Sequence, residues 1–115
     1  MEKNDLIELE KQFEETSAFK QSITRELVGA QHRTGACAKR LSKLNSMQAL
    51  LEGSKEPDEV VARKLDHLKT ELDETEQNYR QLQSQEHRLQ KAEVDALNQL
   101  QDAENALKIE QIKSR

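Results

Sequence analysis

The chain has 115 residues, of which 34% are hydrophobic and 35% are charged. A typical globular domain contains about 45–50% apolar residues, so this composition argues against a compact globular core. The net charge of −4 argues against a nucleic-acid-binding protein, because such proteins usually carry a basic surface. Three glycines and one proline are too few for a fold of short strands and turns, and we therefore expect an all-α protein.

Apolar residues in the first half of the chain repeat every 3.5 residues, which is the heptad pattern of a coiled coil. With Leu6 at position a, most of the a and d positions up to Leu51 are apolar. Asp5 and Glu8 have the spacing of a capping box and indicate where this segment starts. The pattern predicts a helix over about residues 5–52.

A single break interrupts the pattern, at residues 53–57. Gly53 occupies the position favoured after a helix, and Pro57 occupies one tolerated at a helix start. Asp58 and Glu59 then place carboxylates in the first turn of the next segment, where the helix dipole favours them. We expect residues 53–57 to form a turn between two helices.

The second half returns to the heptad pattern, with Leu65 at position a. Most a and d positions are again apolar up to Leu107, and cations follow at Lys108, Lys113 and Arg115. Cations at the end of a helix interact favourably with its dipole. The pattern predicts a second helix over about residues 57–113.

The short turn favours two helices that fold back on each other as an antiparallel coiled-coil hairpin, a single unit over residues 1–115. Residues 27–51 contain cations but no acid, and in the hairpin they face an acidic stretch that begins at Glu71 and ends at Glu76. An extended parallel coiled-coil dimer, interrupted near Pro57, is the alternative architecture.

The a and d positions of each predicted helix form a stripe that a coiled coil usually fills with apolar side chains. Three charged residues occupy such positions: Lys20, Glu86 and Glu93. Polar residues at such positions can specify the register of paired helices at some cost in stability. We expect Lys20 to pair with one or both glutamates and to fix the alignment of the hairpin. The alternative is that these long side chains turn outward to water.

Small residues in the middle of the first helix form a second distinctive set. In the hairpin, Gly29 and Ala30 lie opposite Tyr79, the bulkiest residue of the second stripe, which predicts tight packing there. Gly29 and Gly35 both weaken the helix, by about 1 kcal/mol each relative to alanine. The alternative function for this glycine pair is a flexible hinge.

The sequence contains no recognisable catalytic, metal-binding or cofactor-binding motif. His32, His67 and His87 are far apart and lack the spacing of metal ligands. Cys37 lies at a d position and is expected to be a small core residue. A single cysteine is typical of a reducing compartment, so we expect a cytoplasmic protein. Because the sequence has no catalytic motif and no long apolar run, we expect that it is not an enzyme and has no membrane span.

Several apolar residues lie outside the stripes, among them Val28, Met47 and Leu50. The candidate partner surface comprises Phe19, Val94, Leu97, Ile109 and Ile112. These residues predict contact with helical protein partners or self-association, without nucleic acid. We therefore expect a non-catalytic coiled-coil scaffold or adaptor subunit of an intracellular complex. The alternative is a chaperone-like or export-escort protein that holds client chains along the hairpin.

Overall fold

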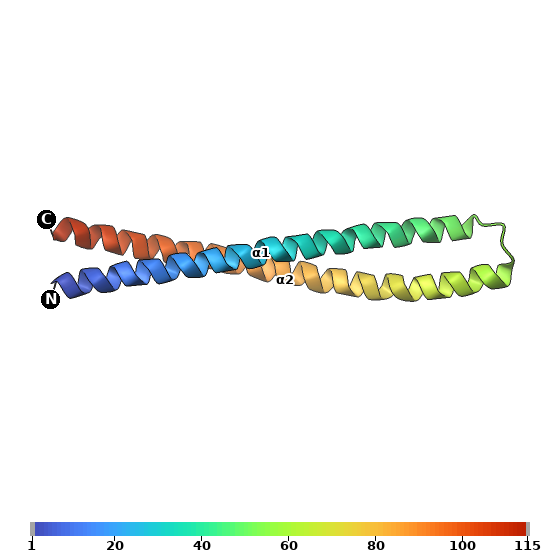
Figure 1. The fold of residues 1–115 in the computed structure, drawn as a ribbon, viewed down its shortest axis with the longest axis horizontal. Helices are drawn as coiled ribbons and strands as arrows, with labels where there is room; N and C mark the ends of the chain where they lie inside the picture. The colour runs from blue at the N-terminus through green and yellow to red at the C-terminus, as the bar shows by residue number, and fades with distance from the viewer. Residues whose placement is uncertain (1, 115) are drawn as a thin grey trace. The chain divides into compact units, whose positions relative to one another are not determined.

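The computed structural model describes residues 2–114, with side chains for residues 4–114. It contains two long helices, α1 (Glu2–Glu52) and α2 (Asp58–Lys113), and no strand within that range. The turn between them spans residues 53–57, as predicted (Figure 1). The all-α helical hairpin expected from the heptad pattern is confirmed.

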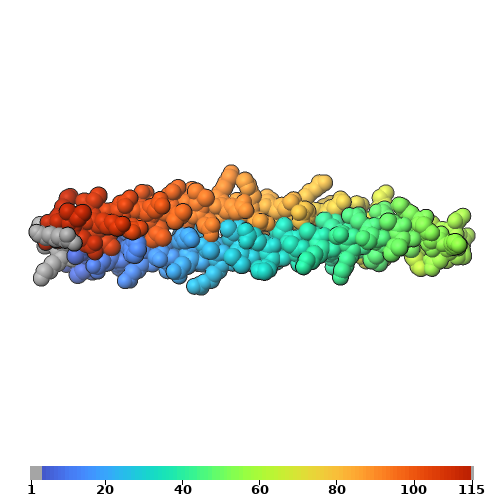
Figure 2. All heavy atoms as spheres, turned by 90° about the horizontal axis from the view of Figure 1, so that it is seen from above, coloured from blue at the N-terminus to red at the C-terminus, as the bar shows by residue number. Residues whose placement is uncertain are grey.

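The chain divides into two compact units. In the first unit, the part of α1 up to Gly29 packs with the part of α2 from His87 onward. Figure 2 shows these two segments in contact, α1 in blue and α2 in red. The second unit, Ala30–Glu86, holds the rest of both helices and the turn.

The core of the second unit is a leucine cluster formed by both helices. Leu44 from α1 and Leu68 and Leu72 from α2 are buried in it, and Leu41 and Leu51 pack against them. Burying one such side chain contributes about 1.5–3 kcal/mol to folding. This cluster holds the two helices together beside the turn.

The first unit has a smaller core. Ile23 and Leu27 of α1 are buried, as are Ala96 and Ala103 of α2. In both units, every buried residue of the described chain lies at a predicted a or d position. The heptad pattern therefore predicts the core of each unit.

Helix α1 begins at Glu2, before the residue predicted to cap it. Asp5 consequently lies inside the helix and does not form a capping box with Glu8. Asp is also not the Ser or Thr on which that motif depends. Helix α2 begins at Asp58, immediately after Pro57, and ends at Lys113, close to the predicted limits.

Helix α1 ends without a left-handed glycine. The Gly53 amide donates to Ala49 O at 3.3 Å, and the Ser54 amide donates to Leu51 O at 3.1 Å. No glycine among the described residues has a positive φ, so Gly53 does not adopt the conformation of an αL cap. The predicted position of the helix end is therefore correct, but the turn does not require the conformational freedom of glycine.

Pro57 immediately precedes α2, and its lack of an N–H costs no hydrogen bond there. Its carbonyl oxygen accepts the amides of Val60 and Val61 at 3.0 and 3.1 Å, while its missing N–H would have had no helical partner. Glu56 in the turn forms an ion pair with Lys64 at 3.0 Å. Neither helix, over the residues described, has a segment long and apolar enough to cross a membrane.

Candidate protein-interaction surfaces

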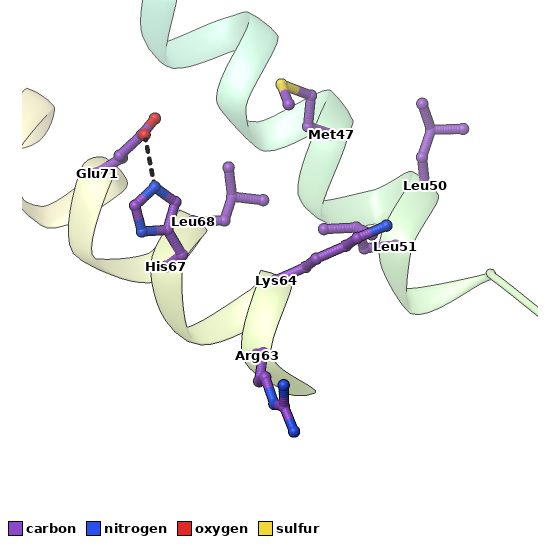
Figure 3. Close-up of a pocket in the computed structure, with 8 residues that line it drawn as sticks. All are labelled: Met47, Leu50, Leu51, Arg63, Lys64, His67, Leu68 and Glu71. Carbon is purple, nitrogen blue, oxygen red and sulfur yellow. Dashed lines mark ion pairs between the residues drawn. The ribbon is translucent and has the colours of Figure 1, made fainter. Parts of the chain in front are cut away.

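The second unit has an apolar groove beside the turn, which we call the turn-end groove (Figure 3). Leu51 and Leu68 point between the helices, and Arg63 points away from α1. Both helices contribute to its lining, which comprises Met47, Leu50, Leu51, Arg63, Lys64, His67, Leu68 and Glu71. The groove is therefore apolar in its centre and charged along its α2 side.

Two apolar side chains of the turn-end groove are largely in water. Met47 is 51% exposed and Leu50 is 75% exposed. Isolated exposed apolar residues are common on proteins, but these two adjoin a groove that Leu51 and Leu68 also line. This arrangement makes the groove a candidate contact surface.

Two polar contacts lie along the charged side of the groove. His67 Nε2 lies 3.3 Å from Glu71 Oε1, and Lys64 pairs with Glu56 in the turn. Arg63 is exposed and has no ion pair with any side chain that the structure describes. A carboxylate from outside the chain could therefore reach Arg63 without displacing an existing partner.

Helix α1 carries a basic ridge that leads toward the turn-end groove. Its residues are spaced three or four apart, which places them on one side of the helix. All of them are exposed: Arg33, Ala36, Arg40, Lys43, Met47 and Leu50. The last two members of the ridge also line the groove.

The acids expected opposite these cations lie near them but do not pair with them. Glu74 lines a shallow groove together with Arg33 and Arg40. Across the described part of the chain, no ion pair joins either arginine, or Lys43, to an acid. The basic ridge therefore keeps its charge available at the surface.

The first part of α1 has a corresponding acidic face with the same spacing. Its exposed residues are Asp5, Glu8, Gln12, Glu15 and Phe19. None of its three carboxylates forms an ion pair with another described residue. On these two faces, α1 carries acids in its first part and cations in its second part.

Of the three residues predicted to set the register of the hairpin, Glu93 makes a contact that the sequence did not predict. Thr24 Oγ1 lies 2.7 Å from Glu93 Oε2 within the first unit, and 3.0 Å from the Lys20 carbonyl oxygen. Lys20 and Glu93 are both half-buried, but no ion pair joins them in the described structure. Glu86 is half-buried in the second unit. The role of Lys20 in the register stays a prediction.

The predicted tight-packing residues differ in burial. Ala30 is fully buried and Tyr79 is half-buried, both in the second unit, whereas Gly29 is half-buried in the first. At Gly35, an added Cβ would have no neighbour within 4 Å. Packing within this chain therefore does not require a glycine at position 35.

Cys37 is a core residue, as its heptad position predicts. Its thiol is buried 3.6 Å from the carbonyl oxygen of Thr75 and 4.0 Å from Asn78 Nδ2. Thr75 is also buried, and its hydroxyl donates to Glu71 O at 2.7 Å. The described residues include no cluster of His, Cys, Asp or Glu that could hold a metal ion.

The apolar residues of the candidate partner surface are exposed. Phe19 on α1 and four apolar residues on α2 lie in water in the first unit: Val94, Leu97, Ile109 and Ile112.

Comparisons with protein-family models, curated proteins and solved structures gave no match. Function is therefore inferred from the surfaces themselves.

Proposed function

We propose that the chain is a non-catalytic coiled-coil scaffold or adaptor subunit of an intracellular complex, which binds other proteins by helix–helix contacts. The observation that carries this proposal is the apolar surface left in water after the heptad stripes are buried. Each residue of this kind can contribute about 1.5–3 kcal/mol when a partner covers it fully.

The apolar residues of α2 in the first unit have the spacing that a partner helix needs. Val94, Leu97, Ile109 and Ile112 fall within an arc of about 120° at 100° per residue. An amphipathic helix lying along α2 would cover them together, which is the usual mode of helix recognition. The free thiol of Cys37 is consistent with a reducing, cytoplasmic environment.

Copurification with a paired set of variants tests this function. Replacing Ile109 and Ile112 with lysine should remove the stoichiometric partners that copurify with the tagged wild-type chain. Val60→Lys, at an exposed apolar residue of the second unit, is the matched control and should retain them. Circular dichroism should show equal helix content in all three proteins. Retention of every partner by the Ile109 and Ile112 variant would contradict the proposed surface.

The turn-end groove favours a second candidate function, that of a chaperone-like or export-escort protein. This groove is lined by Leu51 and Leu68, and the side chains of Met47 and Leu50 beside them are exposed. It therefore offers an apolar surface to an unfolded client. This function predicts that the chain slows aggregation of an unfolded test protein and that Met47→Gln with Leu50→Gln abolishes the effect. An adaptor would show stable, stoichiometric complexes and no such effect.

A further inference from the structure

Two surface grooves of the second unit lie on the same side of its two helices. One is the turn-end groove (Figure 3), and the other is the shallow groove that Arg33 and Arg40 of α1 line together with Glu74 of α2. Seven residues separate Arg40 from Met47, and three separate Glu71 from Glu74, so each helix presents both grooves on one face. All the lining residues belong to the second unit. We call the two grooves together the basic seam.

The α1 side of the basic seam is positively charged and partly apolar. Arg33, Arg40 and Lys43 fall within an arc of about 80° at 100° per residue, and Met47 lies within the same arc. Residues 27–51 contain no acid. No ion pair joins these three cations to any residue that the structure describes, so they are available to a partner.

The α2 side adds cations and acids in equal number. Arg63 and Lys64 line the turn-end groove, and Glu71 and Glu74 line the seam farther from the turn. Together with the three cations of α1, the seam therefore carries a positive excess.

The other side of the same two helices lacks this combination. On α2, two cations, Lys69 and Arg80, share that side with two acids, Asp73 and Glu76. On α1, the residues of that side are uncharged and contain no large apolar side chain: Gln31, Ala38, Ser42, Asn45 and Ala49. The positive excess and the apolar groove therefore occur on one side of the second unit.

We propose that the basic seam binds an acidic amphipathic helix of another protein, which lies along the seam as a third helix against α1 and α2. This inference rests on the proposed function, because it names the class of one partner in the helix–helix contacts. Apolar side chains of the partner cover Met47 and Leu50, which are exposed, and its carboxylates face the cations of α1. Complementary charge selects this partner over a neutral or basic helix.

The length of the seam and the order of its residues define the partner further. From Arg33 to Leu50, α1 extends about 26 Å at 1.5 Å per residue, which accommodates about 18 residues of a helix. The partner places its apolar residues beside the turn, where Met47 and Leu50 lie. It places carboxylates farther along, beside Arg33 and Arg40.

Selection from a displayed library of helical peptides tests the proposal. The peptides have about 18 residues, with leucine at every third or fourth position and glutamate, lysine or glutamine at the flanking positions. Selection on the full chain should enrich glutamate over lysine. Selection on the variant Arg40→Glu with Lys43→Glu should reverse that preference, because the cations that attract the carboxylates have become acids.

The affinity of the most enriched peptide, measured by fluorescence anisotropy, should fall in both seam variants. The dissociation constant should rise about tenfold in Arg40→Glu with Lys43→Glu, and about tenfold in Met47→Gln with Leu50→Gln. The matched control is Lys69→Glu with Arg80→Glu, which makes the same change in net charge on the other side of α2 and should bind like the wild type. Circular dichroism should show equal helix content in all four proteins.

Absence of enrichment, equal enrichment of glutamate and lysine, or a peptide whose affinity survives both seam variants would overturn the inference. A wild-type dimer in sedimentation equilibrium that is lost in Met47→Gln with Leu50→Gln would also overturn it, because a second copy would then occupy the seam. The copurification test of the proposed function uses Ile109 and Ile112 of the first unit. Its outcome does not depend on the seam, so the two failures are distinguishable.

Discussion

Thr24 and Glu93 meet across the two helices of the first unit, with Thr24 Oγ1 2.7 Å from Glu93 Oε2. Glu93 occupies a stripe position, where a carboxylate loses water and needs a donor. The hydroxyl supplies that donor from a flanking position of α1. The contact explains how an acid is accommodated between helices whose other stripe residues are largely apolar.

The Thr24–Glu93 contact predicts a non-additive mutant series. Thr24→Val should destabilise the first unit by about 1–2 kcal/mol, because it removes the donor to a half-buried carboxylate. Thr24→Val combined with Glu93→Leu should recover that loss, since the carboxylate is gone as well. Urea unfolding of the four proteins in a double-mutant cycle measures the coupling. Additive effects would show that the hydrogen bond does not stabilise the fold.

The open space around Gly35 predicts that replacing this residue with alanine stabilises the protein. A Cβ at this position would meet nothing within 4 Å, and the residue lies inside α1. Gly35→Ala should therefore raise the free energy of unfolding by about 0.5–1 kcal/mol through higher helix propensity. Ala62→Gly, at an exposed site in α2, is the reciprocal control and should lower it by a similar amount. A loss of stability in Gly35→Ala would indicate that this glycine serves a conformational role.

The leucine cluster predicts that truncating a buried leucine lowers the stability of the protein much more than truncating an exposed one. Leu68→Ala should destabilise the protein by about 2–4 kcal/mol, because it opens a cavity among Leu44 and Leu72. Leu50→Ala, at a side chain that lies largely in water, should change stability by no more than about 0.5 kcal/mol. Thermal unfolding at a fixed protein concentration compares the two. Equal losses would mean that the core does not lie where the structure places it.

The heptad pattern predicts most of the fold because the apolar residues that repeat every 3.5 positions are those that paired helices bury between them. A residue at position a or d faces the partner helix, and the buried residues Ile23, Leu44, Leu68 and Ala96 all lie there. Gly53 and Pro57 likewise locate the turn, since few other residues in this chain disfavour a helix. The start of α1 at Glu2 was less predictable, because a weak capping signal at Asp5 does not compete with continued helix formation.

The candidate surfaces were only partly predictable. Exposure of Phe19 and Val94 follows from their positions outside the stripe. The Thr24–Glu93 contact does not, because it depends on a side chain beside the stripe and on its rotamer. The turn-end groove also needs side-chain positions from both helices, which a one-dimensional pattern does not supply. The charge pattern predicted acids opposite Arg33, and Glu74 lines a groove with it, but no ion pair joins the two residues.

The helical hairpin itself can be tested with one engineered thiol. Asn78 Nδ2 lies 4.0 Å from Cys37 Sγ, so Asn78→Cys places two thiols side by side across the helices. Ser84→Cys is the matched control, because it moves the second thiol about 9 Å along α2.

The decisive measurement is the mass of the Asn78→Cys protein after treatment with a short thiol cross-linker at low protein concentration. The hairpin predicts an efficient link within a single chain, and a much weaker one in the control. In an extended parallel dimer, 41 residues separate the two thiols along the chain, a distance of roughly 60 Å at 1.5 Å per residue. Products linked only between chains, with both thiols reactive toward a maleimide, would contradict the hairpin.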